Sequence, residues 1–219
     1  MPGFRNILSL FSLLAIAPLA INSCSVADAP PSSAAPVRNV SDYYYPLSNV
    51  GTQYAYLRTS IVGSDTVHLK MQGGDAMPMT INNSQCYAAD LFKDGSFQSD
   101  VYFAQNDSEA FTLGTLSCGT IGGYWLDLKA PLNEGQHWSF FTSSSYTSVK
   151  ITATVVHRGL TMKMPSGKTF DDVTEVRYVG DNADTTTKWF ARGVGMVYSN
   201  SNRSDNYFGS EMRYLSESN

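Results

Sequence analysis

The chain has 219 residues, a formal net charge of −4 at pH 7 and 16% charged residues. This acidic balance, with charges scattered along the chain, excludes the basic footprint of a nucleic-acid-binding protein. Tyr, Phe, Trp, Thr, Ser and Gly are plentiful while charged residues are sparse, which is typical of β-rich proteins. Residues 43–219 suffice for one domain with a hydrophobic core, or for two small halves that share one.

Residues 1–23 have the three parts of an export signal. Arg5 gives the short n-region its positive charge, an apolar stretch follows, and small residues lead into Cys24. The apolar stretch is shorter than the roughly 18–20 residues of a membrane-spanning helix, and Pro18 interrupts it. We therefore expect a signal peptide over residues 1–23 and an exported chain that does not span a membrane.

The sequence Ile21-Asn22-Ser23-Cys24 resembles the lipobox of bacterial lipoproteins. In that family the signal is cut before the cysteine, which then carries the lipid. The resemblance implies a lipid on Cys24 and a membrane anchor, to which buried acyl chains contribute about 0.8 kcal/mol per methylene. Ser25 stands where an Asp would signal retention at the inner membrane, so the resemblance favours the outer membrane of the bacterial cell envelope.

Two alternatives to the lipobox stay open. The first is an ordinary secretory signal in which Cys24 is incidental. The second is a eukaryotic secreted glycoprotein, because Asn-x-Ser sequons begin at Asn39, Asn82, Asn106 and Asn202. The lipobox argues against this second alternative.

Residues 24–42 join the candidate lipid site to the rest of the chain. Pro, Ala and Ser dominate this segment, which has no aromatic residue. Such a composition cannot bury enough apolar surface to offset the entropy of ordering, so it predicts a flexible linker.

Residues 43–219 predict a single all-β domain. Apolar residues alternate with polar ones in Thr147–His157, and Leu160–Met164 is expected as the next strand. Asp94-Gly95 predicts a hairpin that pairs Cys86–Phe92 with Asp100–Gln105. We expect antiparallel curved sheets of about a dozen strands, either a β-sandwich or an open half-barrel.

A short pattern occurs twice in the domain. Pro46-Leu47, then Gly51 and Tyr54-Ala55-Tyr56, is echoed by Pro131-Leu132, then Gly135 and Trp138-Ser139-Phe140. Each Pro and Gly predict a corner, after which two aromatic residues point to one face of a strand. The echo indicates either two similar halves, 43–130 and 131–219, or a chance likeness between two β turns.

Two stretches of the second half carry a further resemblance. Pro165–Val173 and Trp189–Val197 resemble a pattern of uncharacterised bacterial envelope lipoproteins, Pro-x-Gly-x-Phe followed by Trp-Phe/Tyr-Ala-x-Gly-Val-Gly-x-Val. The resemblance implies an antiparallel β fold on a lipid anchor, and it implies no catalytic residues. Gly193 and Gly195 are expected on one face of a strand, where Trp189 or another backbone packs closely. A phosphate-binding loop is the less favoured interpretation, because no helix is expected behind these glycines.

Cys86 and Cys118 are the cysteines left once Cys24 carries the lipid. In an oxidising compartment we expect them to form a disulfide, worth roughly 3 kcal/mol for a loop of about 30 residues; the alternative is two unpaired buried thiols. The scattered histidines lack the spacing of a metal site. These are His68, His137 and His157. With no nucleophile motif either, we expect no catalytic residues, no metal and no cofactor, hence no enzyme.

Aromatic side chains are the remaining candidates for a binding role. They face a ligand cleft or form the core of the domain. The candidate ligand-facing residues are Tyr54, Tyr56, Trp138, Phe140 and Trp189. We expect a membrane-anchored, non-catalytic module that binds or assembles with an envelope protein, glycan or lipid. The alternative is a carrier or sensor of a hydrophobic ligand in a half-barrel of the LolA/LolB type, and an envelope hydrolase is the weaker alternative.

Overall fold

The computed structural model divides the chain into two units, residues 1–36 and 37–219, and only the second contains residues that it describes. The described residues are 39–60, 63–73, 80–81, 83–113, 116–117, 120–121, 124–144, 147–202 and 211–218. The expected signal peptide, the lipobox and Cys24 lie outside these residues.

Within the described residues, one short 3-10 helix precedes fifteen strands, as expected for an all-β domain. The helix is η1 (Val40–Tyr43). The strands are β1 (Gln53–Ser60), β2 (Gly63–Gly73), β3 (Thr80–Ile81), β4 (Ser84–Lys93), β5 (Ser96–Gln105), β6 (Glu109–Leu113), β7 (Leu116–Ser117), β8 (Thr120–Ile121), β9 (Tyr124–Lys129), β10 (His137–Ser144), β11 (Thr147–Lys163), β12 (Thr169–Gly180), β13 (Thr185–Ala191), β14 (Gly195–Ser201) and β15 (Glu211–Ser218).

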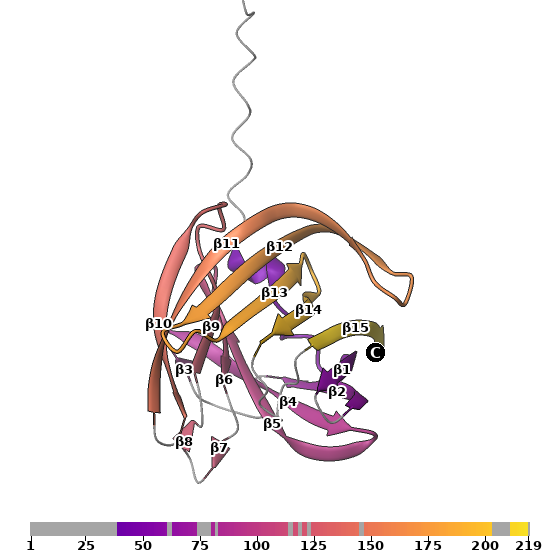
Figure 1. Ribbon diagram of the computed structural model, residues 1–219. Helices are drawn as coiled ribbons and strands as arrows, with labels where there is room; N and C mark the ends of the chain where they lie inside the picture. Colours follow the sequence, from indigo (N-terminus) through magenta and orange to yellow (C-terminus); the bar gives the residue numbers. More distant parts are fainter. Residues whose placement is uncertain are drawn as a thin grey trace, which may run out of the picture. The chain divides into compact units, whose positions relative to one another are not determined.

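Thirteen of the described strands form one antiparallel sheet, and twelve of them follow the order β10-β11-β12-β13-β14-β15-β1-β2-β4-β5-β6-β9. The short β3 pairs with β4 off this path, and β7 pairs with β8 separately. The sheet is strongly curved (Figure 1), so that its two edge strands, β9 and β10, come together. The indole N–H of Trp138 on β10 donates to the carbonyl oxygen of Leu126 on β9, at 3.4 Å. A single sheet that nearly closes on itself is therefore the architecture, rather than two stacked sheets.

Two local predictions have clear outcomes. Asp94 and Gly95 both have positive φ, +48° and +78°, as a type I′ turn requires, and they join β4 to β5 as expected. The strand expected to end at His157 instead continues to Lys163 as β11. Its register shifts near Gly159, whose φ of +66° is available to glycine at little cost, so the chain forms bulges there rather than a turn.

The sheet consists of two halves that follow one another in the chain. Strands β1, β2, β4, β5, β6 and β9 come from the first half, and β10 to β15 from the second. Each set runs as an antiparallel meander, and the two are joined by pairing between β15 and β1. The first set ends with β9 and the second begins with β10, while the interpretation of 43–130 and 131–219 as similar halves stays a prediction.

The echoed pattern forms the same turn at the start of each half. We name these opening turns, residues 46–52 and 131–136. In both, the glycine has positive φ, +87° for Gly51 and +79° for Gly135. Both turns also exchange the same two hydrogen bonds with the neighbouring strand. They are Gly51 N–H to Met71 O (2.8 Å) and Met71 N–H to Thr52 O (2.9 Å), then Gly135 N–H to Val155 O (2.9 Å) and Val155 N–H to Gln136 O (2.9 Å).

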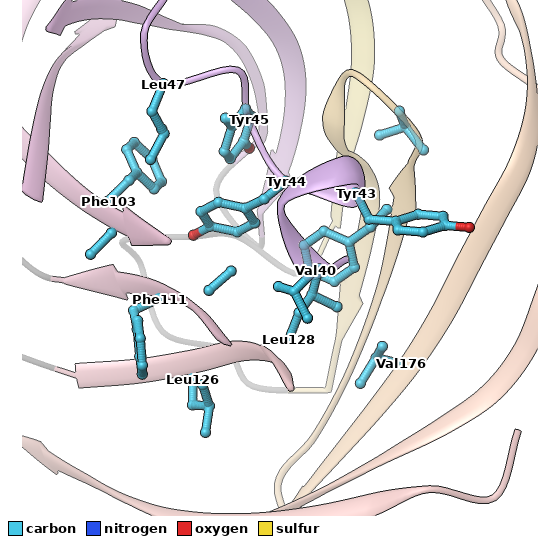
Figure 2. Close-up of a cluster of buried hydrophobic side chains, with 14 of the residues drawn as sticks. Val40, Tyr43, Tyr44, Tyr45, Leu47, Phe103, Phe111, Leu126, Leu128 and Val176 are labelled. Atoms are coloured by element: carbon cyan, nitrogen blue, oxygen red, sulfur yellow. The ribbon is translucent and has the colours of Figure 1, made fainter. Parts of the chain in front are cut away.

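The segment that enters the domain fills the inside of the curved sheet. We name residues 40–47 the N-terminal plug; its buried side chains are Val40, Tyr43, Tyr44, Tyr45 and Leu47 (Figure 2). The ring of Tyr44 contacts Phe103 of β5 and Phe190 of β13, which belong to different halves. Val40, assigned above to the linker, has no exposed surface, so packing begins before residue 43.

Two glycines of the second half contact this plug or the helix that begins it. Gly195 begins β14 with a φ of +98°, and a Cβ there would stand 2.7 Å from the Tyr45 ring. Gly193 donates its N–H to the carbonyl oxygen of Asp42, at 2.7 Å. Gly193 lies in the turn before β14, so the expectation that the two glycines share a strand face is wrong. The close partner of Gly195 is Tyr45 rather than Trp189.

These glycines give a test of the fit between plug and sheet. We expect Gly195→Ala to lower the free energy of unfolding by about 2–4 kcal/mol, because it adds a steric clash with Tyr45 to the cost of positive φ. Gly193→Ala is the matched control: its φ is +74° but a Cβ there meets nothing within 4 Å. We expect about 1–2 kcal/mol for this control by chemical denaturation. Equal losses for the two variants would contradict the fit.

Candidate functional site

Four of the five candidate aromatic residues lie in the core. Tyr54, Tyr56, Trp138 and Phe140 are all buried. Trp189 differs, because its ring is only half-buried and packs against the Tyr198 ring, with 4.7 Å between centroids. Among these five residues, Trp189 is therefore the one with a ring surface available to a ligand.

The cysteine predictions remain untested. Cys86 is buried in β4, while Cys118 and Cys24 lie outside the described residues, so the disulfide and the lipid stay predictions. In the described part of the chain, no group of three or more His, Cys, Asp or Glu side chains is arranged to hold a metal ion. Nor does any helix among those residues have the length and apolar character needed to cross a membrane.

A buried carboxylate is the most densely bonded group inside the sheet. Asp127 of β9 receives hydrogen bonds from Lys188 Nζ at 2.6 Å and from the Tyr44 hydroxyl at 2.8 Å. The Thr112 hydroxyl of β6 donates to the same carboxylate, and the Tyr178 hydroxyl of β12 donates to the backbone carbonyl of Asp127. The carboxylate is therefore compensated by one cation and two hydroxyl donors, as a buried charge requires.

The surroundings of this carboxylate keep its tyrosine partners protonated. Burial, and secondly the charge of Asp127, raise the pKa of Tyr44 and Tyr178 well above the ordinary value. The ammonium group of Lys188 also lies 5.0 Å from the centre of the Trp125 ring, a favourable cation–π arrangement. The Asp127 side chain is only 2% exposed. Its hydrogen bonds connect the plug to both halves of the sheet.

Asp127 and Lys188 were not among the candidate residues expected from the sequence. In each case the available signal was a single charged residue within a run of uncharged residues, 124–128 and 185–191. That signal does not identify a partner, because Asp127 and Lys188 are 61 residues apart in the chain.

The second half of the sheet carries a hollow of about 360 Å³ on its outward face, the face that points away from Asp127. We name this hollow the outer groove. It crosses β11 to β14 and is lined by Val156, Glu175, Arg177, Thr185, Thr187, Trp189, Asn200 and Asn202. Thr187 and Trp189 flank the inward-facing Lys188 on β13. Because side chains alternate along a strand, these two residues point away from the filled interior.

Strand register places residues of the outer groove and of its margin in two rows across β12, β13, β14 and β15. The aromatic row is Glu175, Trp189, Tyr198 and Arg213. The polar row is Arg177, Thr187, Asn200 and Glu211. With neighbouring strands about 4.8 Å apart, each row extends about 14 Å.

Hydrogen bonds hold the Tyr198 ring at the edge of the groove. The Tyr198 hydroxyl donates to Glu211 Oε1 at 2.5 Å, and Arg213 donates to the same oxygen at 2.8 Å. Partial burial opposes ionisation of Glu211, but these two hydrogen bonds outweigh it and lower the pKa of the carboxyl group. Because that pKa is lowered by folding, the stabilisation is present above the unfolded pKa and is lost as pH falls through the folded value.

A second surface hollow, of about 300 Å³, lies beside the bulges of β11 and is less suited to a ligand. Its lining includes Arg158, whose backbone N–H donates to Glu134 at 2.9 Å and whose guanidinium donates to Asn133 at 3.1 Å. Tyr43 of the plug donates to Asp172 in the same lining, at 3.0 Å. These polar groups are engaged with one another, so the outer groove is the stronger candidate site.

The buried network predicts that substitution of Lys188 destabilises the domain much more than substitution of Lys129. Lys188→Met leaves the Asp127 carboxylate without its cation, so we expect the free energy of unfolding to fall by about 3–5 kcal/mol. The control is Lys129→Met, which removes a pair with Glu109 in which the lysine side chain is 46% exposed. There we expect about 0–1 kcal/mol in the same urea titration. If Lys188→Met lowered the free energy of unfolding no more than the control does, the stabilising role of the Asp127–Lys188 pair would be contradicted.

Comparison with known proteins identifies no family. No protein-family model and no curated protein matches the sequence. Among solved structures, the chain is similar to a candidate lipoprotein from Parabacteroides distasonis, with 13% identity, 80% of this chain and 98% of that chain covered, and a TM-score of 0.46. It is also similar to a candidate exported protein with a YmcC-like fold from Bacteroides fragilis, with 12% identity, coverage of 81% and 100%, and a TM-score of 0.45. Similarity at this level does not indicate what the chain binds or does.

Proposed function

We propose that this chain is a lipid-anchored, non-catalytic binding module of the bacterial cell envelope, which holds its ligand in the outer groove. The anchor rests on the likeness of Ile21-Asn22-Ser23-Cys24 to a lipobox, and the same resemblance favours the outer membrane. The flexible linker predicted from the composition of residues 24–42 would let the anchored domain reach a ligand near the membrane surface.

The observation that carries the binding role is the pair of rings of Trp189 and Tyr198 on the outward face of the sheet. Large aromatic side chains contribute most when both faces are covered, and they are the commonest anchors of binding surfaces. Both rings are partly buried here; Trp189 lines the outer groove beside polar side chains, and Tyr198 packs against it from the margin.

The same observations weigh against the two alternatives. A carrier of hydrophobic ligands needs an apolar cavity between the two halves, but Tyr44 and Tyr45 of the plug occupy the space between β5 and β13. A hydrolase usually needs a nucleophile next to a base. The eight residues that line the outer groove include no Ser, Cys or His. A binding module therefore fits the arrangement best.

The anchor is tested on the full-length protein in the cells that produce it. We expect native mass spectrometry after detergent extraction to show an acylated chain that begins at Cys24, and Cys24→Ala to move the protein out of the membrane fraction. Ser25→Ala is the control and should leave fractionation unchanged. An unmodified mass together with unchanged fractionation of Cys24→Ala would contradict the anchor.

The binding role is tested by radical footprinting in intact envelopes. We expect oxidation of Trp189 to fall several-fold relative to the purified protein, because a bound ligand covers its ring. Phe141, a surface aromatic residue on β10 that is 65% exposed, is the internal control and should react equally in both samples. Equal oxidation of Trp189 in the two samples would contradict ligand binding at the groove.

A further inference from the structure

The charges around the outer groove indicate what kind of ligand it takes. The aromatic row ends in Glu175 and Arg213, and the polar row ends in Arg177 and Glu211. Each row thus has one negative and one positive end, and the formal charges of these ends cancel. Such a surface gives no net attraction to a polyanion or a polycation, and it favours an uncharged ligand.

The same rows exclude a purely apolar ligand. Thr187 and Asn200 stand side by side in the polar row, directly next to Trp189 and Tyr198 in the aromatic row. An apolar molecule lying on the rings would cover the hydroxyl and amide groups without offering them hydrogen bonds, which disfavours its binding. The ligand must therefore offer an apolar face on one side and many hydrogen-bonding groups around its edge.

Two charged groups of the groove are available to such a ligand. Within the described residues, neither the Glu175 carboxylate nor the Arg177 guanidinium has a hydrogen-bond or ion-pair partner. Glu175 lies beside Trp189, and Arg177 lies beside Thr187, at the same end of the two rows. A carboxylate accepts hydrogen bonds and a guanidinium donates them, so together they match hydroxyl groups, which do both.

The other end of the rows is held in place before any ligand binds. Glu211 accepts hydrogen bonds from both Tyr198 and Arg213, so the Tyr198 ring is fixed beside Trp189. A binding surface that is already ordered loses less side-chain entropy when the ligand arrives. This arrangement suits a rigid ligand with a flat face.

We infer that the outer groove binds a neutral oligosaccharide, whose sugar rings stack on Trp189 and Tyr198 while hydroxyl groups bond to the polar row. Pyranose rings present C–H groups on one face and hydroxyl groups around the edge, which is the combination that the two rows require. The rows extend about 14 Å, so a few linked sugar units are accommodated. This inference rests on the proposed binding function and names the class of its ligand.

The inference is tested with the full-length protein in detergent, on a panel of short neutral oligomers of glucose, galactose, mannose and N-acetylglucosamine. An oligogalacturonate of similar length is the anionic comparison. We expect at least one neutral oligomer to bind in isothermal titration calorimetry and to bind more tightly than the anionic one. Absence of binding to every neutral oligomer, or tighter binding of the anionic one, overturns the inference.

Single substitutions locate the site of that binding. We expect Trp189→Ala to raise the saccharide Kd about tenfold, and Asn200→Ala, at an exposed position, to raise it about threefold. Phe141→Ala removes an exposed aromatic side chain of β10, outside the groove, and should leave the Kd unchanged. If Trp189→Ala fails to fold, Asn200→Ala and Trp189→Phe still decide the question, and an unchanged Kd in both overturns the inference.

The outcome is separable from that of the proposed function. If no neutral saccharide binds while Trp189 is still protected in intact envelopes, the groove binds another partner, such as an envelope protein. The proposed function then stands and the saccharide inference fails. If Trp189 is unprotected in envelopes and no saccharide binds, both fail.

Discussion

The Asp127 carboxylate is the group on which the interior of this domain depends. It is almost fully buried, and an uncompensated buried charge costs several kcal/mol. Its partners come from three different parts of the chain: Tyr44 from the plug, Thr112 from the first half of the sheet and Lys188 from the second. Insertion of the plug and approach of the two halves are therefore energetically coupled, because the carboxylate is compensated only when all three are in place.

The filled interior decides which face of the sheet is free for recognition. Side chains alternate along β13, so Lys188 points to Asp127 while Trp189 points outward. Sheets that close around a cavity use their inner face for ligands, but here Tyr44 and Tyr45 take that space (Figure 2). Recognition is left to the outer face, where register lines up an aromatic row and a polar row across the second half.

The two halves share their beginning but differ in what they expose. Gly51 and Gly135 make equivalent bonds to the next strand, and each opening turn leads into an antiparallel meander. The aromatic residues that follow the turn are buried in both halves, Tyr54 and Tyr56 in the first and Trp138 and Phe140 in the second. The aromatic pair of the outer groove belongs to β13 and β14, so the repeated start does not imply a repeated site.

Features that depend on neighbours in the chain were predictable from the sequence alone. The all-β fold, the Asp94-Gly95 hairpin and the two opening turns follow from alternation and from residues that tolerate positive φ, which are local properties of the backbone. Alternation did not distinguish Trp189 from Tyr54, because it places residues on two faces without saying which face is covered. Only the tertiary structure decided that, since the plug covers one face through contacts between Tyr44, Asp127 and Lys188, which are distant in sequence.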